Sequence, residues 1–403
     1  MRASVVPARS PAAARWAVAA VFFINGAVIG AWAPLIPLVQ QKLHLSAGQL
    51  GLCLLGMAAG GIVAMPLAGI LASRFGSAPV VRFSTLGLCG TILLPAAAFN
   101  PWLLFLALLS VGVANGAMDV AMNAHGIAVE QALRRPVMSS YHAMYSLGGF
   151  AGALGGAALL RATGHPFAEA ATVGLSLGAL SFMALRFLLP SSADQGGPDH
   201  SHFAFPKGLA VVLGLLCFLV MMAEGYMLDW TAVYLHRSLN ADASLAALGF
   251  SAFSVAMATG RFAGDWLRQR FGAAALVSLS AALAAGGLIV AVAIPQVPFA
   301  ILGFGLCGLG LSNAVPVLYS AGGNLPGASA GSGVAAVATL GYTGFLVGPP
   351  LIGFSAQLVS LGFGLALVGI GCAAVAALAP RVVGKTGVAK PAAVELDRDV
   401  MLG

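Results

Sequence analysis

An aspartate lies inside an apolar segment of this sequence, with an asparagine on either side. The segment GVANGAMDVAMNAHGIAVE covers residues 112–130, and Asn115, Asp119 and Asn123 recur in it every four residues. In a helix this spacing places the three side chains on one face. A carboxyl group inside a membrane helix is costly and is retained where it faces a water-filled cavity or a partner. Because burial disfavours the ionised form, Asp119 has the chemistry expected of a proton carrier, and a hydrogen-bonded contact between helices is the alternative.

Two further segments carry titratable groups in apolar surroundings. Glu224 and Asp229 lie in AEGYMLDW, five residues apart, so their directions on a helix differ by about 140°. We expect Glu224, near the middle of its segment, to face a cavity with Asp119. His142 can change charge near neutral pH and could act as a gate or proton relay, or simply hydrogen-bond at a helix interface. His125 is open to the same two interpretations.

Polar and aromatic residues in other apolar segments are candidates for binding a small solute. Amide groups can hydrogen-bond hydroxyls, and aromatic faces can pack against the apolar side of a ring. The candidate cavity residues are Asn25, Trp32, Asn115, Asn123, Tyr145, Asp229, Asn313 and Tyr342.

The composition indicates that helices spanning a membrane position these groups. The chain is 60% hydrophobic and 8% charged, against roughly 25% charged for a soluble protein. Stretches of about 20 apolar residues are long enough to cross a bilayer. The sequence predicts twelve: 16–38, 49–71, 82–99, 102–126, 138–160, 167–189, 208–232, 245–265, 273–294, 299–321, 331–353 and 360–379. We therefore expect an all-α integral membrane protein.

Charge distribution predicts how these spans are oriented. With the N-terminus inside, all but Lys42, Arg161 and Arg237 of the 19 Lys and Arg fall on the cytoplasmic side. This is the positive-inside pattern, so we expect both termini in the cytoplasm and the chain in a bacterial inner membrane. The net charge of +7 comes from residues dispersed over loops, which argues against a nucleic-acid partner.

The chain divides at one polar segment and shows an internal repeat. The segment 190–207 is rich in turn formers and separates two predicted six-helix bundles, 16–189 and 208–379, flanked by cytoplasmic tails at 1–15 and 380–403. GILASRFG at 69–76 matches GDWLRQRFG at 264–272 with an offset of 196. Asp119 falls opposite Asn313 at an offset of 194. These matches indicate a duplicated, pseudo-symmetric bundle.

The loop motif and the twelve spans resemble the major facilitator superfamily. The family pattern after the second span is G-x-x-x-D-R-x-G, and Gly69, Arg74 and Gly76 fit it, whereas Ser73 stands in place of the aspartate. The resemblance implies the major facilitator fold and a gate on the inner face. In this gate Glu130, at the inner end of the fourth span, could pair with Arg74; the alternative is that both are ordinary solvated charges at the membrane interface. The predicted inner-gate residues are Gly69, Arg74, Gly76, Glu130, Asp265 and Arg270.

The fourth span resembles that of fucose–proton symporters within this superfamily. GAMDVAMN matches their G-x-x-[DE]-x-A-x-N pattern, and the resemblance implies that Asp119 takes part in sugar binding and proton coupling. Ala33 stands where those symporters carry a second acid. The strings AMDVAMNAHGIAVE, RRPVMSSYHAMYSLGG, AEGYMLDWTAVYL and GYTGFLVGPPLIG resemble the MosC-like branch, which is linked to inositol-type opine metabolism.

These observations favour a secondary transporter of a small polar, sugar- or inositol-like solute, coupled to protons through Asp119, Glu224 and His142 and working as a monomer. Proton-driven efflux of amphipathic compounds is one alternative, and a non-transporting sensor is another. The sequence contains no GxxxxGK[ST] nucleotide motif and no recognisable nucleophile–base or HExxH constellation, which argues against an ATP-driven pump and an enzyme. The five cysteines lie in predicted spans without CxxC spacing, and we expect neither a metal nor a cofactor.

Overall fold

The computed structural model describes residues 10–45, 47–194, 207–241 and 243–386. Most of the predicted linker at 190–207 and parts of both predicted tails lie outside these residues. Every regular element in the described ranges is helical. The first helix begins at Pro11, inside the expected tail, because Ser10 caps it through a hydrogen bond from the Ala13 amide.

The first half of the chain forms the helices of the predicted spans one to six. Two spans are interrupted near their ends, where a proline lies at the start of the next short helix or inside it. The elements are α1 (Pro11–Trp32), η1 (Ala33–Leu35), α2 (Ile36–Lys42), α3 (Ala47–Phe75), α4 (Ser77–Thr91), α5 (Leu93–Ala97), α6 (Pro101–Leu133), α7 (Met138–Thr163) and α8 (Pro166–Leu185).

The second half forms the remaining six spans after the short helix η2 (Ser191–Ala193). Its tenth span breaks at Ser312 and Asn313, between α12 and α13. The elements are α9 (Leu209–Leu239), α10 (Ala243–Phe271), α11 (Ala273–Ala293), α12 (Val297–Leu311), α13 (Ala314–Gly323), α14 (Ala330–Leu358) and α15 (Leu361–Val383).

Eleven spans in the described residues are long and apolar enough to cross a membrane. The predicted eighth span is not among them. It corresponds to α10, which is 29 residues long but carries Arg261, Asp265, Arg268 and Arg270 in its second half. These charges lower its hydropathy, and two of the arginines are buried against the other half of the protein. In the described residues, α10 is therefore a long helix that turns a polar face toward the first half.

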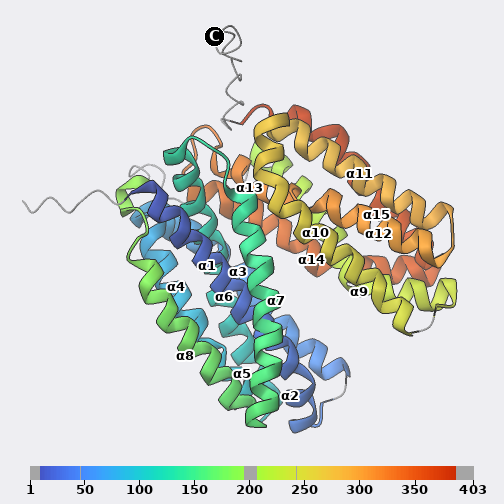
Figure 1. Ribbon diagram of the computed structural model, residues 1–403, viewed down its shortest axis with the longest axis horizontal. Helices are drawn as coiled ribbons and strands as arrows, with labels where there is room; N and C mark the ends of the chain where they lie inside the picture. The colour runs from blue at the N-terminus through green and yellow to red at the C-terminus, as the bar shows by residue number, and fades with distance from the viewer. Residues whose placement is uncertain (1–9, 46, 195–206, 242, 387–403) are drawn as a thin grey trace, which may run out of the picture.

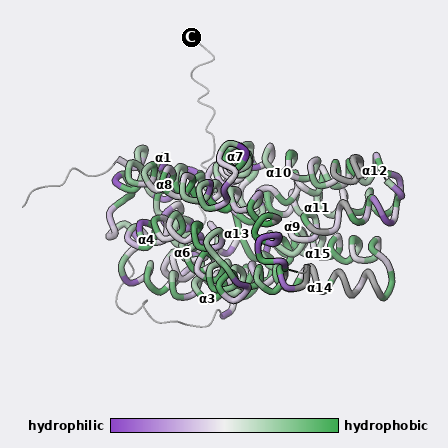
Figure 2. Tube along the Cα trace, turned by 90° about the horizontal axis from the view of Figure 1, so that it is seen from below, coloured by the Kyte–Doolittle hydropathy of each residue, from purple (hydrophilic) through white to green (hydrophobic). Residues whose placement is uncertain are grey.

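The two halves lie side by side as separate bundles. Figure 1 shows α1 to α8 on the left and α9 to α15 on the right, meeting at the end where α1 begins and α15 ends and separating toward the opposite end. Figure 2, turned by 90°, shows mainly apolar helices in both bundles with only scattered polar segments. We call the end at which the bundles meet the termini end.

The internal repeat is visible in matching backbone geometry. Gly76 precedes α4 and Gly272 precedes α11, and both have a φ of 79°. This left-handed region favours glycine, because an added Cβ would clash with the backbone. At Gly76 the Cβ would also lie 2.4 Å from the carbonyl oxygen of Ser191. The two glycines are separated by the offset of 196 found in the sequence, so the shared motif forms the same sharp turn in each half.

Small residues bring α1 and α7 into backbone contact. A Cβ at Gly148 would lie 2.1 Å from the carbonyl oxygen of Phe23, and one at Gly152 would lie 2.0 Å from that of Ala27. Both glycines lie on one face of α7, four residues apart. This face supports the close helix contact that small residues allow in membranes.

Replacing Gly152 by valine is expected to destabilise the protein. The new side chain meets backbone that cannot move aside, so the cost should exceed the about 1–3 kcal/mol typical of overpacking. Gly155→Val is the matched control, since a Cβ at Gly155 has nothing within 4 Å. Thermal unfolding in detergent should show a clearly lower midpoint for Gly152→Val alone. Equal midpoints for the two variants would contradict the close α1–α7 contact.

Candidate functional site

A central cavity lies between the two halves. Its volume is about 540 Å³, and residues from α1, α6 and α7 face residues from α9, α10, α13 and α14 across it. Aromatic side chains supply much of its wall: Phe22, Tyr145, Phe150, Phe250, Phe253, Phe262, Tyr319, Tyr342 and Phe345. Its polar groups are few: Asp119, His142, Ser146, Glu224, Ser254 and Arg261, besides the tyrosine hydroxyls. Such a mainly apolar pocket with few convergent polar groups is typical of a small-molecule site.

Asp119 is held on the cavity wall by donors from both halves. The side chain is 7% exposed. Its Oδ1 accepts a hydrogen bond from the Asn123 amide at 3.3 Å, and its Oδ2 accepts one from the Tyr319 hydroxyl at 3.4 Å. Tyr319 belongs to α13, in the other half. A change in the protonation of Asp119 therefore alters a contact that joins the halves.

Asn123 connects Asp119 to His142. The amide nitrogen of Asn123 donates to the backbone carbonyl and the carboxylate of Asp119, which leaves its Oδ1 as an acceptor. The Nε2 atom of His142 lies 3.1 Å from this oxygen. Because an amide oxygen only accepts, His142 must carry a proton on Nε2. Asp119, Asn123 and His142 thus form one hydrogen-bonded chain.

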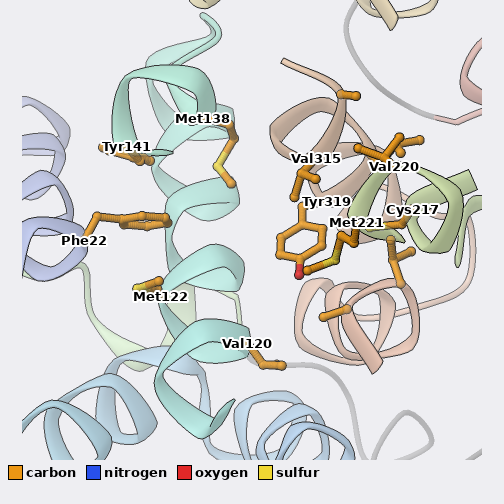
Figure 3. Packing of buried hydrophobic residues seen from close by; sticks show 14 of the residues in the cluster. Phe22, Val120, Met122, Met138, Tyr141, Cys217, Val220, Met221, Val315 and Tyr319 are labelled. Carbon is orange, nitrogen blue, oxygen red and sulfur yellow. The ribbon is translucent and has the colours of Figure 1, made fainter. Parts of the chain in front are cut away.

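Aromatic packing surrounds this chain at the junction of the halves. The ring of His142 packs against Phe22 at 5.3 Å and edge-on against Tyr319 at 6.0 Å, measured between centroids. Figure 3 shows Phe22, Met122 and Tyr141 on one side and Val315, Tyr319 and Met221 on the other. The polar chain is therefore flanked by apolar groups, while Asp119 and His142 also line the cavity.

Glu224 faces the same cavity together with Arg261. The guanidinium of Arg261 lies 3.8 Å from a carboxylate oxygen of Glu224 and donates to the Ser146 hydroxyl at 2.7 Å. Ser146 belongs to α7, so Arg261 also links the halves. The second carboxylate oxygen of Glu224 and the Nε of Arg261 are buried without a hydrogen-bond partner. One acceptor and one donor are thus available beside the cavity to a bound polar solute.

Several predicted cavity residues lie away from the cavity. Asn25 donates to the Asn115 side chain at 3.1 Å, joining α1 to α6. Trp32 is buried, and its Nε1 has no partner. Asn313 donates to the Gly260 carbonyl at 3.0 Å, beside Arg261, and so holds α10 in place. The cavity wall includes none of these four residues, and it does not include Asn123, which was also predicted to line it.

Asp229 is a further predicted cavity residue, and its side chain lies outside the described part of the structure. Tyr145 and Tyr342, also predicted, both line the cavity.

An ion pair closes the termini end between the halves. Glu130 binds Arg268 of α10 through two hydrogen bonds, at 2.8 Å and 3.1 Å, and accepts another from the Ser320 hydroxyl at 2.7 Å. The Val137 and Met138 amides donate to the same carboxylate. We had expected Arg74 as the partner of Glu130, but the structure gives this role to Arg268. The end of α3, which carries Arg74, packs against α14 instead.

The other gate residues contribute differently. Asp265 accepts hydrogen bonds from the Ser139 and Ser140 amides at 2.9 Å each, and so caps α7 from the opposite half. A Cβ at Gly69 would lie 2.4 Å from that of Ala335, where α3 crosses α14. Arg270, predicted as a gate residue, is exposed and stacks over Trp266.

Beneath this gate, His125 has a structural position. Its Nε2 accepts from the Leu189 amide at 3.0 Å, and its Nδ1 lies 2.7 Å from the Ser77 hydroxyl. Asp194 accepts from the Ser77 amide at 3.1 Å and so caps α4. Burial raises the pKa of Asp194 above its ordinary value, and the hydrogen bonds from Ser77 partly offset this effect. These contacts hold the segment that follows α8 against the start of α4.

Sequence inspection had not singled out Arg261, Arg268 or Tyr319. All three lie in predicted spans or at their ends, and an arginine inside a span is itself a signal for a functional partner. Arg261 stands in VAMATGRFAG, an otherwise apolar stretch. Tyr319 carries no such signal, since a single tyrosine in a span is ordinary.

Two related six-helix halves around one cavity define a multi-pass membrane transporter. A scan against family models matches residues 18–349 to the Major Facilitator Superfamily. The chain belongs to this superfamily.

Relatives and solved structures agree with this assignment. An MFS-type transporter of Yersinia pestis is 39% identical over 88% of this chain and 90% of its own length. Membrane protein MosC of Rhizobium meliloti is 35% identical over 87% and 86%. The fold resembles FucP, the Escherichia coli fucose:proton symporter: its outward conformation has a TM-score of 0.78 at 17% identity, covering 95% of this chain and 99% of FucP. The proton:xylose symporter XylE gives 0.68 at 15% identity, over 94% of this chain and 98% of XylE.

Proposed function

We propose that this protein is a proton-coupled secondary transporter of a small polar, sugar- or inositol-like solute. It works by alternating access in a bacterial cytoplasmic membrane, with both termini in the cytoplasm. The observation that carries the proposal is the position of Asp119, buried on the cavity wall and bonded to Tyr319 of the opposite half. A proton on this carboxyl group connects solute binding to the contact between the halves.

The coupling mechanism follows from the contacts between the halves. In the present conformation Glu130 and Arg268 join the halves at the termini end, and the two bundles separate toward the other end. Solute and proton enter from that side, where Asp119 is reached through the cavity. Protonation neutralises Asp119, and a neutral carboxyl group can be enclosed without its hydration water. The loaded cavity can therefore close. Opening at the termini end then releases both to the cytoplasm.

Polar groups on the cavity wall support a hydroxyl-rich solute. A hydroxyl can accept from the Nε of Arg261 and donate to the free oxygen of Glu224, both without partners in the structure. The tyrosine and phenylalanine rings offer flat surfaces to the apolar side of a sugar or cyclitol ring. The neighbours FucP and XylE, which are named as symporters of fucose and xylose with protons, support the same class.

The aromatic lining favours a second candidate function. Much of the wall is apolar, with Phe150, Phe250 and Phe262 among its residues. Such a surface also suits amphipathic compounds, which a proton-driven antiporter would export.

Purified protein in liposomes tests both candidates. Internal pH and tracer uptake are recorded on addition of sugars, inositols, their amino derivatives and amphipathic cations. We expect a hydroxyl-rich solute to carry protons inward with it. Proton movement opposite to the solute, seen with amphipathic cations alone, would replace the first candidate by the second. Liposomes without protein and with heat-treated protein are the controls.

A further inference from the structure

A second large cavity lies on the outside of the first half, away from the transport site. Its volume is about 890 Å³, and its walls come from α3, α4 and α6. We call it the α3–α4 groove, after the two helices at its rim. It is lined by Leu71, Phe75, Pro79, Val80, Phe83, Ser84, Gly87, Thr91, Leu109, Ser110, Val113, Ala114 and Ala117.

The groove faces the surrounding bilayer and is apolar. Phe83 at its rim is 80% exposed and Phe75 is 48% exposed, on helices that span the membrane. Its hydroxyl groups bond back to their own helices: Ser84 to the Val80 carbonyl, Ser110 to the Leu106 carbonyl and Thr91 to the Leu88 carbonyl. Small polar solutes therefore find no free side-chain donor there, whereas hydrocarbon fits.

The length of the groove matches one leaflet of a bilayer. Its lining runs along α4 from Pro79, near the start of the helix, to Thr91 at its end. Twelve residues of helix rise about 18 Å. One leaflet contributes about 15 Å of hydrocarbon. An acyl chain entering at the termini end would thus reach roughly the bilayer midplane.

A cation lies at the mouth of the groove. Arg74 is exposed at the end of α3, and its guanidinium lies 5.2 Å from the ring centroid of Phe75, which lines the groove. Basic residues at the cytoplasmic ends of membrane helices attract anionic lipid headgroups. The charge stands at the end where an acyl chain in the groove would join its headgroup.

We propose that the α3–α4 groove binds an anionic phospholipid of the leaflet on the termini side. An acyl chain fills the groove, and the phosphate lies by Arg74. The groove shares its walls with working parts of the transporter. Ala117 lines the groove two residues before Asp119, and Leu71 lines it two residues after Gly69, which contacts α14 of the other half. A bound chain therefore braces α3 and α6 from the outside.

The glycines of α4 provide a matched pair of variants. A Cβ at Gly87, in the groove wall, meets only the Cβ of Ala114, at 3.9 Å. A Cβ at Gly90, exposed on the same helix but outside the groove lining, meets nothing within 4 Å. Gly87→Phe fills the groove with little strain, whereas Gly90→Phe adds the same side chain elsewhere. Arg74→Gln removes the charge and leaves the groove open.

The probe is phosphatidylglycerol with a photoreactive diazirine in one acyl chain, diluted into phosphatidylcholine liposomes that hold the purified protein. Labelled positions are mapped by peptide mass spectrometry, with diazirine phosphatidylcholine as the neutral comparison. We expect labels to concentrate on the groove lining. Phosphatidylglycerol should exceed phosphatidylcholine there by roughly fivefold, the factor expected for one arginine at an anionic surface. Gly87→Phe should lose the groove labels, Gly90→Phe should keep them, and Arg74→Gln should abolish the preference between the lipids.

Three results would overturn the proposal. Labels spread evenly over the membrane-facing helices would show that the groove is no site. Equal labelling by the two lipids in the wild type would show that the groove does not select an anionic headgroup. Cross-linking of two protein chains through α4, with the groove free of lipid labels, would assign it to a second copy. Because Arg74→Gln does not alter the groove's shape, its readout stands even where Gly87→Phe folds poorly.

Discussion

Asp119→Asn is expected to abolish solute accumulation against a gradient while leaving solute exchange. Asparagine keeps the shape and can still bond to Asn123 and Tyr319, but it cannot take up or release a proton in this pH range. One proton moving with a neutral solute gains about 2.3 kcal/mol from a membrane potential of 100 mV. That energy corresponds to a roughly fiftyfold accumulation ratio. Without coupling, the ratio should fall to about one.

The measurement is tracer uptake into liposomes with an imposed potential, beside counterflow of labelled solute without one. Glu169→Gln is the matched control. Glu169 is also a buried carboxyl group in the first half, and both of its oxygens lack partners, but it does not line the cavity. The control variant should accumulate solute like the wild type. Unchanged accumulation by Asp119→Asn would leave Asp119 with a structural role only. Loss of both accumulation and exchange would show that Asp119 is needed for solute binding, so that its part in proton coupling could not be measured separately.

Arg268→Met is expected to shift the protein toward the conformation that is open at the termini end. The Arg268–Glu130 pair is buried and bidentate, and it joins the halves. Removing one partner of a buried ion pair typically costs about 3–5 kcal/mol, since it leaves an unpaired charge. Opening the gate brings Glu130 to water and relieves that cost. A difference of about 1.4 kcal/mol between the two conformations already shifts their ratio tenfold.

Spin labels report this shift as distances between the halves. One pair at Arg135 and Gln269 reports on the termini end, and another at His165 and Gln296 reports on the opposite end; all four positions are exposed. In Arg268→Met the first distance should lengthen and the second should shorten. Arg270→Met is the matched control, because Arg270 is exposed and stacks on Trp266. It should keep the wild-type distances.

A double variant distinguishes the effect of losing the attraction between Arg268 and Glu130 from the effect of leaving the Glu130 charge unpaired. Combining Glu130→Gln with Arg268→Met removes both charges, so it should shift the distances less than Arg268→Met alone. Wild-type distances in Arg268→Met would show that the pair does not hold the gate. The same shift in Arg270→Met would show that Arg270, the gate residue predicted from the sequence, also holds the termini end closed.

The sequence by itself determined the class of fold. Apolar stretches long enough to cross a bilayer predict helices, because the hydrocarbon core leaves few other ways to satisfy backbone hydrogen bonds. The position of Asp119 was predictable in the same way, since a carboxyl group in an apolar helix needs a polar environment. The repeat offset indicated a duplicated bundle, and the structure shows matching turns at Gly76 and Gly272, which are separated by that offset. The apolar spans and Asp119 are local signals within single stretches of sequence, and the repeat is found by comparing two such stretches.

Only the tertiary structure decided which residues meet across the halves. Arg268 and Arg270 are two residues apart and equally charged, yet helix rotation buries the first against Glu130 and exposes the second. In the second half of the repeat, Asn313 occupies the position that corresponds to Asp119. It bonds to the backbone of α10, because α12 ends beside it. The meeting of Tyr319 with Asp119 joins residues 200 positions apart. Such contacts depend on the packing of one bundle against the other, which no local pattern of residues records.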